Sequence, residues 1–218
     1  MVGSESAPDA RSAERALVLG YAPAEAIGAV RALFALDDTL AAILRTTTEP
    51  MIGQMRLTWW HEALCALDAA PPPAHPLLQS LAATGVSGAA MADMIDGWDA
   101  LLEEPLNEEA MHRHAQARGG GLFALVAGVS GFADARVTAW GEGWALVDLS
   151  RHLRDAQLAE QAREEARVRL GDRFAPAVEA RGRVLGALVT AARMDLAERA
   201  PGSPGRVARL AWHRLTGR

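Results

Sequence analysis

The sequence predicts an all-α protein, a helical bundle built as a single domain. Ala, Leu and Arg dominate its 218 residues, whereas β-branched and aromatic residues are few. Ala, Leu and Arg lose little side-chain freedom in a helix, so this composition favours helices. Half of the residues are hydrophobic, which is enough for a large core in a chain of this length. No segment has the alternation of a strand, and no repeat period is visible.

The first helices follow from apolar spacing and from the residues that interrupt it. Residues 1–9 are polar and predict a disordered N-terminus ahead of a helical domain over 10–218. Asp9 or Ser12 is a suitable cap for a short helix that ends at Leu19. Long helices are expected over 24–45 and 50–69. Three threonines separate them, and Pro50 suits the first turn of the second helix, where its missing N–H is not needed.

Further helices are expected over 75–83 and 87–102, after a rigid proline connector at 71–73. Asn107 is a suitable cap for a helix that runs through the three glycines at 119–121. Each glycine costs about 1 kcal/mol relative to Ala inside a helix. Such a cost indicates a kink, a close helix crossing or a ligand against the backbone. Helices over 135–155, 174–199 and 207–215 complete the bundle, and the charged segment up to Arg169 is an exposed helix or a mobile segment.

Charge and cysteine content exclude several classes of function. The net charge is −5 and no run of basic residues exists, which argues against nucleic acid as the partner. The single cysteine, Cys65, excludes an intrachain disulfide and fits a reducing compartment, so we expect a cytoplasmic protein. No segment resembles a secretory signal or a membrane span, although peripheral membrane contact stays open.

Two groups of residues are candidates for catalysis. Asp37 and Asp38 are adjacent acids beside an apolar run, but neighbouring residues on a helix point about 100° apart, so alone they make a poor metal site. The second group contains Asp148, Arg151, His152 and Asp155, whose spacings place them on one face of a continuous helix. There, Asp148 and Asp155 are candidate metal ligands and Arg151 a candidate phosphate contact. The alternative is a ladder of surface ion pairs.

His112 and His114 lie two residues apart, close to Arg113 and Arg118. Residues two apart do not share a helix face, so this pair is a weak candidate for a zinc site.

Five segments resemble the squalene/phytoene synthases, which join two prenyl diphosphates head to head on the all-α isoprenoid synthase fold. They are VRALFALDDTLAAI from Val30, PMIGQMRLTWWHEAL from Pro50, MIDGWDAL from Met94, HAQARGGGLFALVAGVSG from His114 and GWALVDLSRHLRD from Gly143. The first and last resemble the family's two aspartate-rich segments, and the fourth resembles the small-residue helix that lines its prenyl cavity. The resemblance implies the isoprenoid synthase fold with a central apolar cavity.

Both acidic motifs depart from the pattern of active synthases. Aligned on the apolar run before Asp37, the acid positions of the first motif fall on Ala41, Ala42 and Arg45. In the second motif, His152 replaces an aspartate unless the register shifts by three residues to Asp155. The Tyr-Leu-Pro signature that follows in the family is missing.

These departures imply a divergent short member with eroded acidic motifs. Such members are thought to act in the assembly of respiratory complex I, and the segment from Arg56 to Trp60 is typical of them. We therefore expect an accessory or assembly protein, with a protein partner or with prenyl lipid in the cavity. The alternative is an active prenyl transferase that holds Mg²⁺ with Asp37, Asp38, Asp148 and Asp155.

Overall fold

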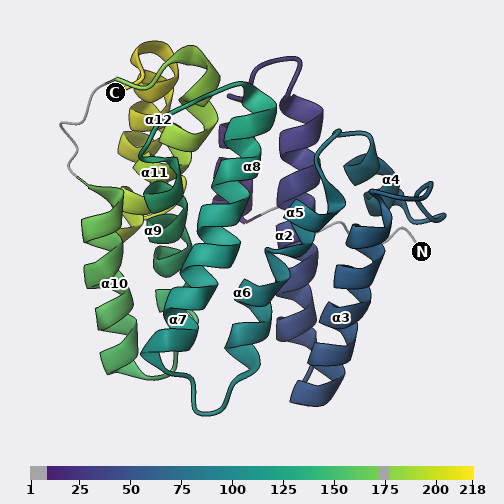
Figure 1. The fold of residues 1–218 in the computed structure, drawn as a ribbon. Helices are drawn as coiled ribbons and strands as arrows, with labels where there is room; N and C mark the ends of the chain where they lie inside the picture. Colours follow the sequence, from purple (N-terminus) through teal and green to yellow (C-terminus); the bar gives the residue numbers. More distant parts are fainter. Residues whose placement is uncertain (1–8, 172–176) are drawn as a thin grey trace, which may run out of the picture.

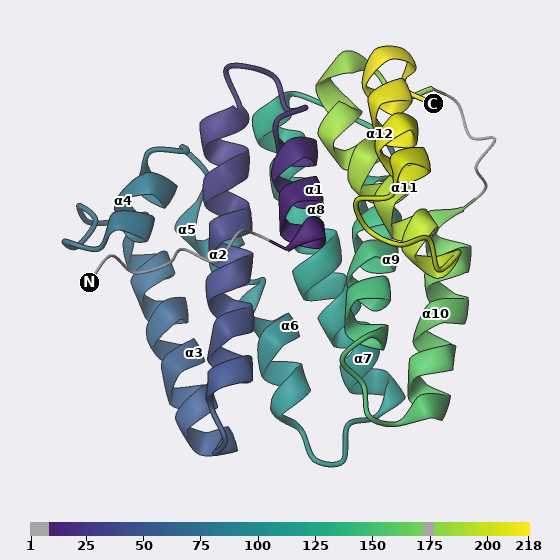
Figure 2. The ribbon, with the colours of Figure 1, turned by 180° about the vertical axis from the view of Figure 1, so that it is seen from behind.

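A computed structural model describes residues 9–171 and 177–218 and confirms the predicted all-α class, since the described residues form helices and loops only. Of residues 1–9, which were expected to be disordered, residues 1–8 lie outside these ranges and Asp9 caps α1. Figures 1 and 2 show long helices with roughly parallel axes packed side by side. The short α5 and α6 lie between α3 and α8, and α4 lies at the outer edge, beside α2. The helices are α1 (Ala10–Leu19), α2 (Ile27–Thr46), α3 (Pro50–Ala66), α4 (Pro76–Ala82), α5 (Gly88–Ala92), α6 (Ile95–Asp99), α7 (Glu108–His114), α8 (Gly121–Ser130), α9 (Val137–Ser150), α10 (Ala156–Leu170), α11 (Arg183–Leu196) and α12 (Pro204–Thr216).

The predicted helix through the three glycines exists, and it contains a π-helical turn, η2 (Ala115–Gly120), between α7 and α8. Gly119 of this turn crosses α9 at Gly141 so closely that a Cβ on either residue would collide with the carbonyl of the other. Of the three explanations for the glycines, the structure therefore supports the close helix crossing. The crossing brings Arg118, one residue before Gly119, against α9.

Most predicted bounds shift by up to about three residues, and three predicted helices differ by more than that. The segment expected as one helix over 87–102 divides into α5, α6 and a 3₁₀ turn (Ala100–Leu102). The helix expected over 135–155 ends at Ser150, and Asp155 instead caps α10. The helix expected from 174 begins only at Arg183, while residues 172–176 lie outside the described ranges.

The core centres on α9, which packs against η2, α8, α10 and α11. Phe34 of α2 and Phe123 of α8 both contact the Trp144 ring, at centroid distances of 6.0 and 5.6 Å. These rings fill the interior between the three helices. Within 9–171 and 177–218, no helix has the length and apolar character that a bilayer-crossing segment needs.

Helix α3 lies at the edge of the bundle beside α2 (Figure 2). Its inner face is made by Gly53, Leu57, Trp60 and Leu64, which are buried. Its outer face exposes an apolar stripe of Met51, Ile52, Met55 and Trp59, next to exposed polar residues such as Gln54 and Arg56. Four large apolar side chains grouped on the exposed side of one helix are unusual for a protein surface.

Candidate functional site

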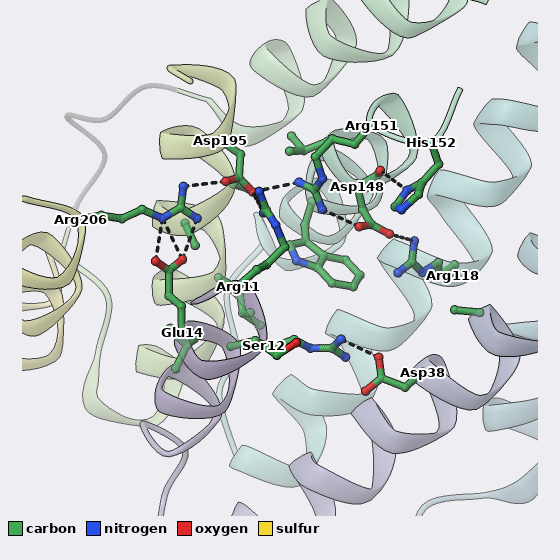
Figure 3. A pocket seen from close by; sticks show the side chains of 18 of the residues that line it. Arg11, Ser12, Glu14, Asp38, Arg118, Asp148, Arg151, His152, Asp195 and Arg206 are labelled. Atoms are coloured by element: carbon green, nitrogen blue, oxygen red, sulfur yellow. Dashed lines mark hydrogen bonds and ion pairs between the residues drawn. The ribbon is translucent and has the colours of Figure 1, made fainter. Parts of the chain in front are cut away.

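A polar cleft of about 300 Å³ opens between α1, α2, α9 and α11 (Figure 3). Its lining contains six arginines, Arg11, Arg15, Arg45, Arg118, Arg151 and Arg206, and four acids, Glu14, Asp38, Asp148 and Asp195. Most of these side chains pair with one another rather than point freely into the cleft.

Arg118 forms the centre of a first group of ion pairs, the Arg118 cluster, with Asp37 and Asp148. Its Nε and Nη2 donate to the two carboxylate oxygens of Asp37 at 2.8 and 3.0 Å, and its Nη1 donates to Asp148 Oδ2 at 2.8 Å. Asp37 is 1% exposed and Arg118 is 4% exposed. Arg118 therefore joins α2 to α9, and its guanidinium balances the charge of an acid from each of the two acidic motifs.

Aromatic and polar groups enclose the Arg118 guanidinium. It lies over the rings of Trp98 and Trp144, 4.3 and 4.8 Å from their centroids, in cation–π geometry. His114 donates from Nδ1 to the carbonyl of Gly97 at 2.7 Å, which leaves Nε2 to accept from Arg118 Nη1 at 3.3 Å. Burial, together with the charge of Arg118, lowers the pKa of His114 to about 3. The imidazole is therefore neutral at physiological pH, as its acceptor role requires.

Asp148 is held by two arginines. Burial alone would raise its pKa, but Arg118 and Arg151 outweigh burial and hold the pKa of Asp148 well below its usual range. Arg151 donates to Asp148 Oδ1 at 2.6 Å and to Asp195 Oδ2 at 2.9 Å. Arg151 therefore connects the Arg118 cluster to a second group of ion pairs.

The second group, the Arg206 cluster, contains Arg206, Glu14 and Asp195. Arg206 is 1% exposed; its Nε and Nη2 donate to the Glu14 carboxylate at 2.6 to 2.8 Å, and its Nη1 donates to Asp195 Oδ1 at 2.6 Å. Arg11 donates to Asp195 Oδ2 at 2.8 Å. This cluster joins α1, α11 and the start of α12.

The other two candidate acids lie outside both clusters. Asp38 is exposed at the cleft and pairs with Arg15 at 2.6 Å. Asp155 does not line the cleft: its Oδ1 accepts from the N–H groups of Gln157 and Leu158 at the start of α10. The expectation that Asp148 and Asp155 share one helix face is wrong, because α9 ends at Ser150 and the chain turns before Asp155.

A second cavity, of about 200 Å³, adjoins the cleft near Trp98 and Leu149. Its walls are mainly apolar, with Leu44 and Leu101 on the other sides. Sites for small-molecule ligands usually measure about 300 to 1,000 Å³, so this cavity is small for a prenyl chain. The Phe34 and Phe123 rings pack against Trp144, which also lines the cleft.

Comparison with known families agrees with this fold. A family model described as squalene/phytoene synthase matches residues 9–198. The chain belongs to the squalene/phytoene synthase family. No curated protein and no solved structure gives a significant match.

The cleft of this family member does not fit the Mg²⁺ that the family resemblance implies. A magnesium site needs carboxylate oxygens that are free to face the ion. Both oxygens of Asp37 accept from Arg118, and both oxygens of Asp148 accept from arginines. At the positions where the resemblance expects acids, Ala41 and Arg45 line the cleft instead.

The sequence pattern placed Arg118 only beside His112 and His114, a weak candidate for a zinc site. It did not predict that Arg118 pairs with the two acids. Its contacts with Asp37 and Asp148 span 81 and 30 residues of sequence, which no local spacing reveals. The three glycines were the available signal, because they allow the close crossing that places Arg118 against α9. Glu14, Asp195 and Arg206 had no comparable signal.

Proposed function

We propose that this protein has lost prenyl-diphosphate condensation and acts as an accessory or assembly protein. The observation that carries the proposal is the position of Arg118 between Asp37 and Asp148. The guanidinium of Arg118 binds the carboxylates that a divalent metal would need. A metal that bound these carboxylates would leave the buried guanidinium unpaired between two tryptophans, at a cost of several kcal/mol.

The acids of the two motifs therefore hold helices together through arginine and do not serve as metal ligands. Condensation requires a metal clamp that stabilises the departing diphosphate. In this cleft the charge of each central acid is already balanced by an arginine within 3.0 Å. The remaining acid of the first motif, Asp38, faces Arg15 at the exposed end of the cleft.

The outer face of α3 supports the accessory role. Met51 and Met55 are 74% and 68% exposed, and Trp59 is 49% exposed. Methionine side chains adapt to partner surfaces, and tryptophan is a frequent anchor in protein interfaces. The exposed charges of this helix, Arg56 and Glu62, are of opposite sign, so the face lacks the basic border of a helix that binds anionic membranes. We therefore assign it to a protein partner, and the family resemblance suggests the assembly of respiratory complex I.

Diphosphate release tests the loss of synthase activity. The protein is incubated with farnesyl or geranylgeranyl diphosphate and Mg²⁺, and an active squalene/phytoene synthase serves as the positive control. We expect no release above the rate without protein, and no change of melting temperature on addition of Mg²⁺. Turnover that disappears in Asp148→Asn would establish the alternative, an active prenyl transferase.

Complementation tests the accessory role. In a deletion strain with reduced complex I activity, a variant with both Asp148→Asn and Asp155→Ala is expected to restore activity, whereas Met55→Glu with Trp59→Glu is expected to fail. Val168→Glu is the matched control, because Val168 is an equally exposed apolar residue on α10, away from α3. The assignment of α3 is wrong if the α3 variant complements as well as the control. Vesicle binding by the wild-type chain that the α3 variant loses would instead indicate a membrane surface.

A further inference from the structure

Away from the cleft, α7 and α10 bring together three side chains that can ligate a metal. Glu108 and His112 lie one helical turn apart on α7, and Glu165 faces them from α10. Figure 1 shows the two helices close to each other at the end of the bundle opposite α12. One ligand atom from each residue lies within 4.8 Å of the other two.

The distances are close to those of a zinc site. Zinc bonds of about 2.0 to 2.2 Å in tetrahedral geometry separate neighbouring ligand atoms by about 3.3 Å. His112 Nε2 lies 2.9 Å from Glu165 Oε2 and 3.9 Å from Glu108 Oε1. The first distance is shorter and the second is longer than the separation that zinc requires. Glu108 is exposed and His112 is half-exposed, so rotation of these side chains can make the remaining adjustment.

The local charge favours a cation. Glu142 and Glu165 share one guanidinium, that of Arg169, and Glu108 adds a further carboxylate beside His112. Arg169 donates from Nε to Glu142 at 2.8 Å and from Nη1 to Glu165 Oε2 at 2.9 Å. The hydrogen bond from Arg169 goes to Oε2, and Glu165 Oε1 lies 3.0 Å from His112 Nε2. Arg169 can keep its bond to Glu142 when Glu165 turns towards a metal.

We propose that Glu108, His112 and Glu165 bind a divalent cation of the zinc class, which fastens α10 to α7. One imidazole and two carboxylates supply three ligands, and water completes the tetrahedron. The imidazole selects zinc over magnesium or calcium, which prefer oxygen ligands alone. The cation joins α7 to the charged side of α10, whose buried face consists of Ala159, Ala162, Ala166 and Leu170. With water as the fourth ligand, the coordination is open, unlike that of a closed structural zinc site.

Calorimetric titration of the metal-free full chain with Zn²⁺ tests the site. All variants are made in a Cys65→Ser background. Cys65 Sγ lies 3.9 Å from His61 Nδ1, and this thiol and imidazole would otherwise offer Zn²⁺ a second place to bind. We expect one bound Zn²⁺ per chain, with affinity reduced roughly tenfold or more by His112→Gln and by Glu165→Gln. Glu160→Gln is the matched control on α10 and is expected to bind like the parent.

An effect of opposite sign separates the site from general surface binding. Arg169→Met removes the guanidinium that competes for Glu165, so we expect at least severalfold tighter Zn²⁺ binding. Zn²⁺ is also expected to raise the melting temperature of the parent and not that of His112→Gln, because a ligand bound only by the folded state stabilises it. The proposal is overturned if the parent binds no Zn²⁺, or if His112→Gln binds it as the parent does.

Discussion

The Arg118 cluster and the Arg206 cluster use the same chemistry for different purposes. In each, one buried arginine holds two carboxylates from different helices. The Arg118 cluster lies behind tryptophan rings and takes its acids from the two acidic motif segments. The Arg206 cluster takes its acids from α1 and α11 and fastens helices from the two ends of the chain.

The two clusters differ in which carboxylates the guanidinium occupies. A pair of buried acids that stays ionised needs a compensating charge, such as a metal ion or a guanidinium. At the Arg206 cluster the guanidinium only connects helices. At the Arg118 cluster it also takes the carboxylates of the acidic motifs, and Arg151 joins the two groups through Asp148 and Asp195.

Arg118→Met is expected to have the largest effect. It removes the partner of both Asp37 oxygens and two cation–π contacts, so we expect a loss of about 4 kcal/mol in the free energy of unfolding. Urea unfolding at pH 7.5 measures it. Arg163→Met is the control, because Arg163 pairs with the exposed Glu160 and an exposed pair contributes about 0 to 1 kcal/mol. Equal losses in the two variants would contradict the central role of Arg118.

Arg206→Met is expected to cost less, about 2 kcal/mol by the same measurement. Asp195 keeps its bonds to Arg11 and Arg151, so only Glu14 loses its arginine. A loss larger than that of Arg118→Met would reverse the order of the two clusters.

Mild acid is expected to weaken the Arg118 cluster through His114. The folded protein holds the pKa of His114 at about 3, below the value of about 6.5 in an unfolded chain. The unfolded state therefore binds a proton first, and stability is lost as the pH falls from about 6.5 towards 3, by up to about 1.4 kcal/mol per pH unit.

His213, whose pKa burial lowers to about 4, adds to this loss in the same direction. Urea unfolding at pH 7.5 and pH 5 is expected to show a smaller pH dependence in His114→Gln than in the wild type. An unchanged dependence would mean that His114 does not titrate on unfolding.

Asp155→Ala is expected to have the smallest effect, about 1 kcal/mol, because it removes only the cap of α10. Asp148→Asn is the comparison, since it breaks bonds to two arginines and should cost more in the same unfolding experiment. Similar losses for Asp148→Asn and Asp155→Ala would contradict the separation of the two acids.

Local signals in the sequence predicted most helices of this fold. Asp9 and Asn107 cap α1 and α7 as expected, and Pro50 begins α3. Helix ends were less accurate where no strong breaker occurs: nothing in the residues around Ser150 marks the end of α9. Because that end was missed, Asp155 was placed on the same face as Asp148.

The candidate site was predicted in part. Asp37, Asp148 and Arg151 do come together, and Asp38 lines the same cleft. Their partner Arg118 was not recognised, because an ion pair across 81 residues leaves no periodic trace in the sequence.

Composition, apolar spacing and caps by themselves determined that this chain is helical, because helix formation and capping depend on near neighbours. The sequence also carried the resemblance to the squalene/phytoene synthases. Only the tertiary structure decided what the acids do. Whether a carboxylate faces a metal, a guanidinium or a helix end depends on which distant helices meet, and here the crossing at Gly119 and Gly141 places Arg118 between Asp37 and Asp148.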